Sequence, residues 1–182
     1  MRAFFKLFVL ITTVMFFSGC SSLEALNPFS SSEPKEGYLE LRKINDNLTL
    51  QMPLHERIVT DDIKIVSVKT FPSAEKNRLI VEADFIFTSF EIPEGLPAIA
   101  NFNSSLAYEP KTKEFRFTNL ELIDIKFLKR ELVEYISTKQ KKFIKNTLER
   151  KLQEIVLHQS KKQFGVIESF ETKDGKIKVK FK

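Results

Sequence analysis

Apolar and polar residues alternate with a period of two in four stretches along the middle of the chain. These stretches span residues 62–71, 78–89, 98–109 and 114–125. In the clearest of them, Leu79, Val81 and Phe85 fall on one face of an extended strand. Short connections with turn-forming residues separate the stretches, which indicates an antiparallel meander of four strands.

The fourth stretch changes its apolar face partway along. Phe115 and Phe117 share one face, whereas Leu120 has the opposite parity. The switch near Thr118-Asn119 predicts a β-bulge or a bend at that point of the strand.

A helical spacing of apolar residues replaces the alternation over residues 127–160. The apolar positions are Leu128, Leu132, Ile136, Phe143, Leu148, Leu152 and Ile155, and the opposite face carries Lys139, Lys141, Lys142, Lys145, Arg150 and Lys151. This pattern predicts one amphipathic helix of about eight turns, roughly 45 Å long.

Shorter elements are expected on either side of these segments. Leu41, Ile44 and Leu48 predict a helix over residues 38–49, with a strand over residues 48–52 as the competing interpretation. Near the C-terminus, Asp174-Gly175 favours a hairpin between residues 166–172 and 177–180.

Together these elements predict an α+β fold. We expect a curved antiparallel four-stranded meander wrapped on a long C-terminal amphipathic helix. A short N-terminal helix and a closing C-terminal hairpin complete the expected domain, which occupies residues 38–182.

The N-terminus has the pattern of an export signal. Arg2 and Lys6 precede an apolar run over residues 7–17, which is too short for a transmembrane helix. The ending Phe17-Ser18-Gly19-Cys20 resembles a bacterial lipobox. We therefore expect residues 1–19 to be a lipoprotein signal peptide and Cys20 to carry acyl chains; an ordinary signal peptide with a nearby Cys is the alternative.

The residues after the lipobox indicate where the protein is held. Ser21 resembles the sorting residue of outer-membrane lipoproteins in a Gram-negative host, so we expect anchoring on the periplasmic face of the outer membrane. Residues 20–37 are rich in Ser, Pro and Glu and predict a flexible tether.

Composition narrows the classes of function. The 182 residues are 42% hydrophobic and 29% charged, which is typical of a globular protein, and the single Cys excludes a disulfide framework. The net charge of +5 falls to about +3 once Arg2 and Lys6 are removed with the signal peptide. Such a weakly basic, exported domain is not expected to bind nucleic acid.

Residues that could support catalysis are sparse. The chain has no G-x-S-x-G, no Gly-rich phosphate loop and no C-x-x-C. His55-Glu56 lacks the second His of a zinc protease helix, and His158 stands alone in its segment. We expect a protein that is not an enzyme and that needs no metal or cofactor.

A hydrophobic ligand site is the functional hypothesis that the predicted elements support. A sheet curled around a long helix can leave an elongated apolar cleft, and the residues expected at that cleft are Phe85, Phe87, Phe102, Phe115, Phe117, Ile136, Phe143 and Ile144. The alternative is that these side chains form the core. The lysines of the long helix are interpreted as a solvated face, with a patch for anionic lipid as the alternative.

The order of elements resembles that of the YceB-like family of bacterial lipoproteins. The similar stretches are residues 48–53, Asn77-Arg78-Leu79, residues 115–125 with the ending Leu120-Glu121-Leu122-Ile123-Asp124, and Lys176-Ile177-Lys178-Val179. The family has no established activity, and its fold is similar to one half of the tubular lipid-binding modules. The resemblance thus implies an elongated apolar cleft in an envelope lipoprotein that binds a lipid or other hydrophobic ligand. The alternative function is an envelope interaction or assembly factor with a packed core and a protein partner.

Overall fold

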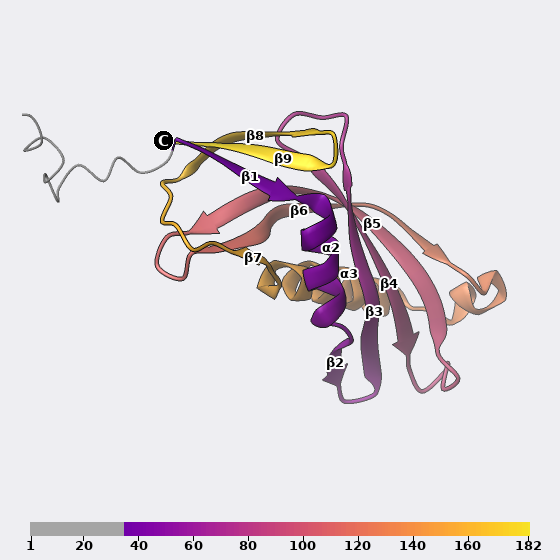
Figure 1. Ribbon diagram of the computed structural model, residues 1–182. Coiled ribbons are helices and arrows are strands. Elements are labelled where there is room, and N and C mark those ends of the chain that lie inside the picture. The colour runs from indigo at the N-terminus through magenta and orange to yellow at the C-terminus, as the bar shows by residue number, and fades with distance from the viewer. Residues whose placement is uncertain (1–34) are drawn as a thin grey trace, which may run out of the picture. The chain divides into compact units, whose positions relative to one another are not determined.

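Two antiparallel sheets form the framework of the protein. The structure, a computed structural model, describes residues 35–182 (Figure 1). The predicted signal peptide, Cys20 and the tether up to residue 34 lie outside the described residues. The described residues form a compact unit, which contains every residue of the hydrophobic core.

The larger sheet has six strands in the order β2-β3-β4-β5-β6-β7. Their bounds are Leu54–Ile58 for β2, Asp61–Pro72 for β3, Leu79–Thr88 for β4, Leu96–Glu109 for β5, Glu114–Phe127 for β6 and Val156–Gln159 for β7. Strands β3 to β6 are the four that alternation predicts. Strand β2 was not expected, because its sequence is mostly polar and it pairs only along the β3 edge.

The smaller sheet has the order β1-β9-β8, with β1 at Glu36–Glu40, β8 at Ile167–Lys173 and β9 at Lys176–Phe181. The predicted C-terminal hairpin is confirmed as β8 and β9. Asp174 and Gly175 at its turn have φ of 51° and 72°, and a two-residue type I′ hairpin turn requires positive φ at both positions. The last two residues of the predicted tether, Glu36 and Gly37, lie in β1 and pair with β9.

Within residues 35–182, three short helices accompany the sheets: α2 at Leu41–Leu50, the 3-10 helix η2 at Arg130–Tyr135, and α3 at Thr138–Glu154. The short N-terminal helix is confirmed as α2, and the competing strand over residues 48–52 is not formed. The buried side chains of α2 are Leu41, Ile44 and Leu48, the three that define its apolar face in the sequence.

The predicted fold class is wrong, and the long helix is the reason. The described part of the chain is mostly β, with 52% of it in strands, and its helices are short. The segment over residues 127–160 folds as the end of β6, η2, α3 and β7. Ser137 starts α3 with a capping box, because its hydroxyl accepts a hydrogen bond from the Gln140 backbone N–H at 3.2 Å while the Gln140 side chain accepts from the Ser137 N–H at 2.9 Å. After α3, Val156 leaves helical geometry to pair with Arg116 in β6.

The predicted bulge in β6 is confirmed. Ser105 pairs with Thr118 and Asn103 pairs with Glu121, so two residues of β6 lie opposite one residue of β5. Asn119 adopts a φ of 48° at this point. The bulge turns the apolar side chains of the second half of β6 back to the inner face of the sheet, which is the face that α2 and α3 cover.

The β4–β5 connection depends on a glycine. Gly95 has a φ of 82°, and a Cβ there would lie 2.8 Å from Cγ2 of Ile86. We expect Gly95→Ala to lower the free energy of unfolding by about 2 kcal/mol, from left-handed strain plus this contact. Gly175→Ala is the control, since Gly175 also has positive φ but a Cβ there meets no atom within 4 Å. Urea unfolding should show a smaller loss for Gly175→Ala; equal losses would contradict the contribution of Ile86.

Candidate functional site

The eight residues expected at an apolar cleft lie mostly in the core. Phe85, Phe87, Phe102, Phe115, Phe117, Ile136 and Ile144 are buried, and Phe143 is partly buried and packs against the same core. The five phenylalanines of the strands belong to the buried core, and Phe115 packs there against Tyr108, Phe164 and Phe181. Of the eight, only Ile144 also lines the apolar groove described next.

A groove lies between the second half of β6 and the first half of α3. It has a volume of about 620 Å³ and is lined by Leu122, Ile125 and Phe127 of β6, Val133 of η2, and Thr138, Lys141, Lys142, Ile144 and Lys145 of α3. We call this feature the β6–α3 groove. Its walls are apolar, and its lysines all belong to α3.

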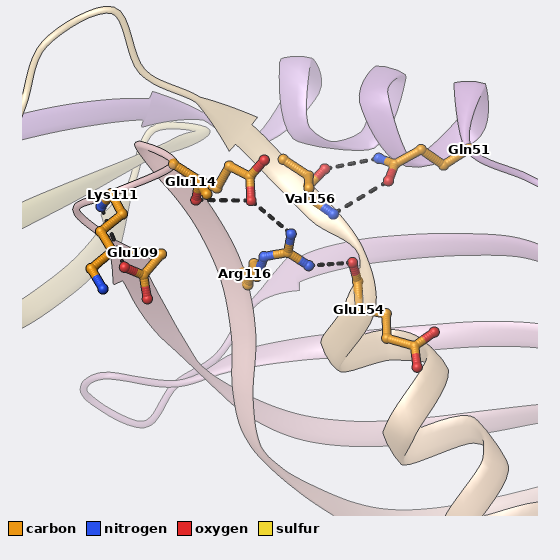
Figure 2. A network of polar contacts seen from close by, with 8 residues as sticks. Gln51, Glu109, Lys111, Glu114, Arg116, Glu154 and Val156 are labelled. Carbon is orange, nitrogen blue, oxygen red and sulfur yellow. Dashed lines mark hydrogen bonds and ion pairs between the residues drawn. The ribbon is translucent and has the colours of Figure 1, made fainter.

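The path of α3 across the sheet creates this groove. At the C-terminal end of α3, Arg116 of β6 donates a hydrogen bond to the backbone carbonyl of Glu154 (Figure 2). At the N-terminal end, Gln140 donates instead to Asp61 of β3 at 3.3 Å. The helix therefore begins near β3 and ends near the start of β6, and it leaves the inner face of the rest of β6 partly uncovered. Strand β7 pairs with β6 only at residues 114–116 and covers no more of it.

A polar network holds the C-terminal end of α3 in place. The Arg116 guanidinium contacts the Glu114 carboxylate at 2.6 Å, and Gln51, which follows the last residue of α2, exchanges two hydrogen bonds with the backbone of Val156 (Figure 2). The hydrogen bond from Arg116 lowers the pKa of the Glu114 carboxyl below its ordinary value. The network joins α2, β6, α3 and β7, and its role is structural.

The apolar surface continues beyond η2. A second hollow of about 500 Å³ shares Ile125, Phe127 and Val133 with the β6–α3 groove and adds Lys126, Leu128 and Arg130. The two hollows meet at the shared side chains. The apolar lining thus extends from the first turns of α3 to the segment that follows β6.

Basic residues are concentrated around this surface. Residues 126–145 contain seven Lys or Arg and two Glu, a net charge of +5, which equals the net charge of the whole chain. Lys126 lies 3.5 Å from Asp124 and Lys145 lies 3.8 Å from Glu149, both longer than a close ion pair. Among residues 35–182, Lys141 and Lys142 form no ion pair. An anionic group at the groove would meet the ammonium groups of Lys141 and Lys142 without displacing an acidic partner.

Polar side chains of the larger sheet make structural hydrogen bonds. The hydroxyl of Ser104 donates to backbone carbonyls of β5 and β6, and Asp84 accepts a hydrogen bond from Ser67 at 2.5 Å. Burial lowers the pKa of His158, so its imidazole is neutral at neutral pH. Across the described residues, no three His, Cys, Asp or Glu side chains gather as a metal site, and no helix is long and apolar enough to span a membrane.

Sequence reasoning missed the apolar residues of the β6–α3 groove apart from Ile144. Leu122, Ile125 and Phe127 have no regular spacing, because a second irregularity in the β5–β6 register leaves Ile123 without a partner. The sequence did indicate the lysines of the groove, since Lys141, Lys142 and Lys145 belong to the basic face of the predicted helix. No known family model matches the chain, and comparison with curated proteins finds no match.

Proposed function

We propose that this domain binds an anionic amphiphile, a molecule with an aliphatic chain and a negatively charged head, in the β6–α3 groove. The observation that carries the proposal is an apolar groove whose lysines lie on one wall only. Its volume of about 620 Å³ falls within the range of ordinary small-molecule sites.

The two walls of the groove suit the two ends of such a ligand. An aliphatic chain against Leu122, Ile125 and Phe127 would leave water at a gain of about 0.8 kcal/mol per buried methylene group. Lys141 and Lys142 are exposed side chains whose stems can lie along apolar surface while their ammonium groups stay in water. The head of the ligand would therefore lie along α3.

The cellular setting is part of the same proposal. The lipobox at Cys20 and the following Ser21 support an outer-membrane lipoprotein held on the periplasmic face by its acyl chains. The four consecutive strands β3 to β6 support the resemblance to the YceB-like lipoproteins, although the long helix that the resemblance includes is not formed. A non-enzymatic carrier or receptor of envelope lipids fits both features.

Binding of dodecanoate below its micelle-forming concentration tests the proposal. With residues 21–182, which include the entire core, we expect Ile125→Asp to weaken dodecanoate binding at least tenfold, because the carboxylate would replace an apolar wall and repel the ligand head. Ile123→Asp is the matched control, because Ile123 lies on the same strand, is 52% exposed and does not line the groove. Isothermal titration calorimetry gives both affinities.

The charge of the head is tested separately. Lys141→Gln with Lys142→Gln should weaken dodecanoate binding by up to about fivefold per charge and leave dodecanol binding unchanged, since exposed ion pairs contribute up to about 1 kcal/mol each. Equal affinity of wild type and folded Ile125→Asp for dodecanoate, or no binding by either, would reject the groove as the site. The alternative, an envelope interaction factor with a protein partner, would then stand.

A further inference from the structure

The segment between β6 and α3 holds apolar side chains in the solvent. Leu128 is 61% exposed and Tyr135 is 53% exposed. The backbone N–H of Leu128 donates to the carbonyl of Pro97 at 2.9 Å, and the N–H of Ile136 donates to the carbonyl of Val133 at 3.2 Å. Hydrogen bonds therefore hold the backbone before and after η2, next to these two exposed side chains.

Basic side chains surround the same segment. Lys126, Lys129 and Arg130 are exposed and flank Leu128. The first turns of α3 add Lys139, Lys141, Lys142 and Lys145, and Glu131 and Glu134 are the acidic residues between positions 126 and 145. Since this stretch carries a net charge of +5 and so does the whole chain, the remainder of the sequence is neutral on balance.

We propose that this segment docks the domain on an anionic lipid bilayer. A Tyr side chain suits the headgroup region, an exposed Leu can enter the acyl boundary, and Lys and Arg are attracted to the negative surface. A protein partner is a less good fit, because interface cores are depleted in Lys whereas this patch is rich in it. Docking does not require that the β6–α3 groove takes up a ligand.

The orientation follows from the shared lining of the two hollows. Leu128 and Arg130 line the hollow that continues from the β6–α3 groove. A bilayer contacted by Leu128 and Arg130 would therefore lie next to the end of the β6–α3 groove that continues into this hollow. The opposite end of β6 lies at the β5–β6 turn, where the backbone N–H of Ser160 donates to the carbonyl of Lys113. That end of β6 lies away from the segment that would contact the bilayer (Figure 1).

Vesicle binding by residues 21–182, which lack the lipidated Cys20, tests the docking surface without the anchor. We expect binding to vesicles of phosphatidylcholine mixed with phosphatidylglycerol, weaker binding to phosphatidylcholine alone, and a decrease as salt is raised. Lys129→Gln with Arg130→Gln should weaken binding to the mixed vesicles by about 30-fold, from the loss of two charges near the surface. Leu128→Ser should weaken binding to both kinds of vesicle.

A matched control removes the same charge elsewhere. Lys161 and Lys162 are exposed and lie next to Ser160, at the other end of β6. Lys161→Gln with Lys162→Gln should change vesicle binding by less than about threefold, as expected for charges held farther from the surface than a Debye length. Equal losses in the two double variants would overturn the proposal, as would equal binding to the two kinds of vesicle.

A variant confined to the groove separates this proposal from the previous one. Leu122→Asp should lose dodecanoate binding and keep vesicle binding, because Leu122 lines the β6–α3 groove but not the hollow beside Leu128. Loss of vesicle binding in folded Leu122→Asp would overturn docking through the segment. Vesicle binding without any dodecanoate binding would support docking and reject the groove as a ligand site.

Discussion

Replacing Phe102 by alanine is expected to lower the free energy of unfolding by about 3–5 kcal/mol, the largest effect expected of a single substitution here. Phe102 lies on β5 between Val81 of β4 and Leu122 of β6, and its side chain is 0% exposed. Truncating the ring removes its apolar contacts and leaves a cavity that the surrounding strands can fill only in part. Urea unfolding of residues 21–182 measures the change.

The matched control for Phe102→Ala is Phe90→Ala in the β4–β5 connection. Phe90 is 83% exposed, so its truncation should change the free energy of unfolding by no more than about 0.5 kcal/mol. The pair also tests the location of the ligand site. A small loss of stability in Phe102→Ala together with loss of dodecanoate binding would show a cleft at Phe102 and contradict its place in the core.

Replacing Asn45 by alanine is expected to lower the free energy of unfolding by about 2–4 kcal/mol. Asn45 of α2 bonds to Thr70 of β3 three times. Its Oδ1 accepts from the Thr70 backbone N–H and from the hydroxyl, both at 2.8 Å, and its Nδ2 donates to the Thr70 carbonyl at 3.2 Å. Thr70 is buried, so alanine at position 45 would leave its backbone groups without partners.

The control for Asn45→Ala is Asp46→Ala, one residue further along α2. Asp46 is exposed and its side chain makes no hydrogen bond to the described part of the chain, so we expect a change within about 0.5 kcal/mol. Thermal or urea unfolding of both variants gives the comparison. Similar stabilities of the two variants would show that water replaces Asn45 at Thr70 without cost.

Local patterns predicted strands β3 to β6 and the hairpin of β8 and β9, but not β1, β2 or β7. The alternation of Val81, Ala83 and Phe85 with polar neighbours specifies which face of β4 is buried, because side chains along a strand point alternately to opposite faces. The same reasoning located the bulge at Asn119 and the turn at Asp174-Gly175 from a few adjacent residues. These features depend on the local sequence and are visible without a tertiary structure.

The helical segment shows where local reasoning failed. Apolar residues from Ile136 to Ile155 satisfy a helical period, yet the capping box at Ser137 begins a new helix and Val156 ends in a strand. The capping sequence Ser137 to Gln140 was available as a signal for the helix start. No local signal announces strand β7. Residues 156–159 become extended because they pair with β6, which lies far away in the sequence.

The residues of the candidate site could be identified only from the tertiary structure. Phe102 and Ile125 are both apolar residues on the inner face of neighbouring strands, and the sequence does not distinguish a core residue from a groove residue between them. The difference lies in how far each side chain is covered: Phe102 is 0% exposed in the core, whereas Ile125 is only partly buried and lines the β6–α3 groove.

The sequence by itself therefore determined strands β3 to β6, the C-terminal hairpin and the basic character of residues 139–145, and the lipid anchor at Cys20 stays a prediction. Only the tertiary structure decided that the expected ligand-binding phenylalanines are mostly core, and that an apolar groove lies beside Lys141 and Lys142. The physical reason is that strand period and turn geometry are set by neighbouring residues, whereas exposure is set by which distant elements pack together.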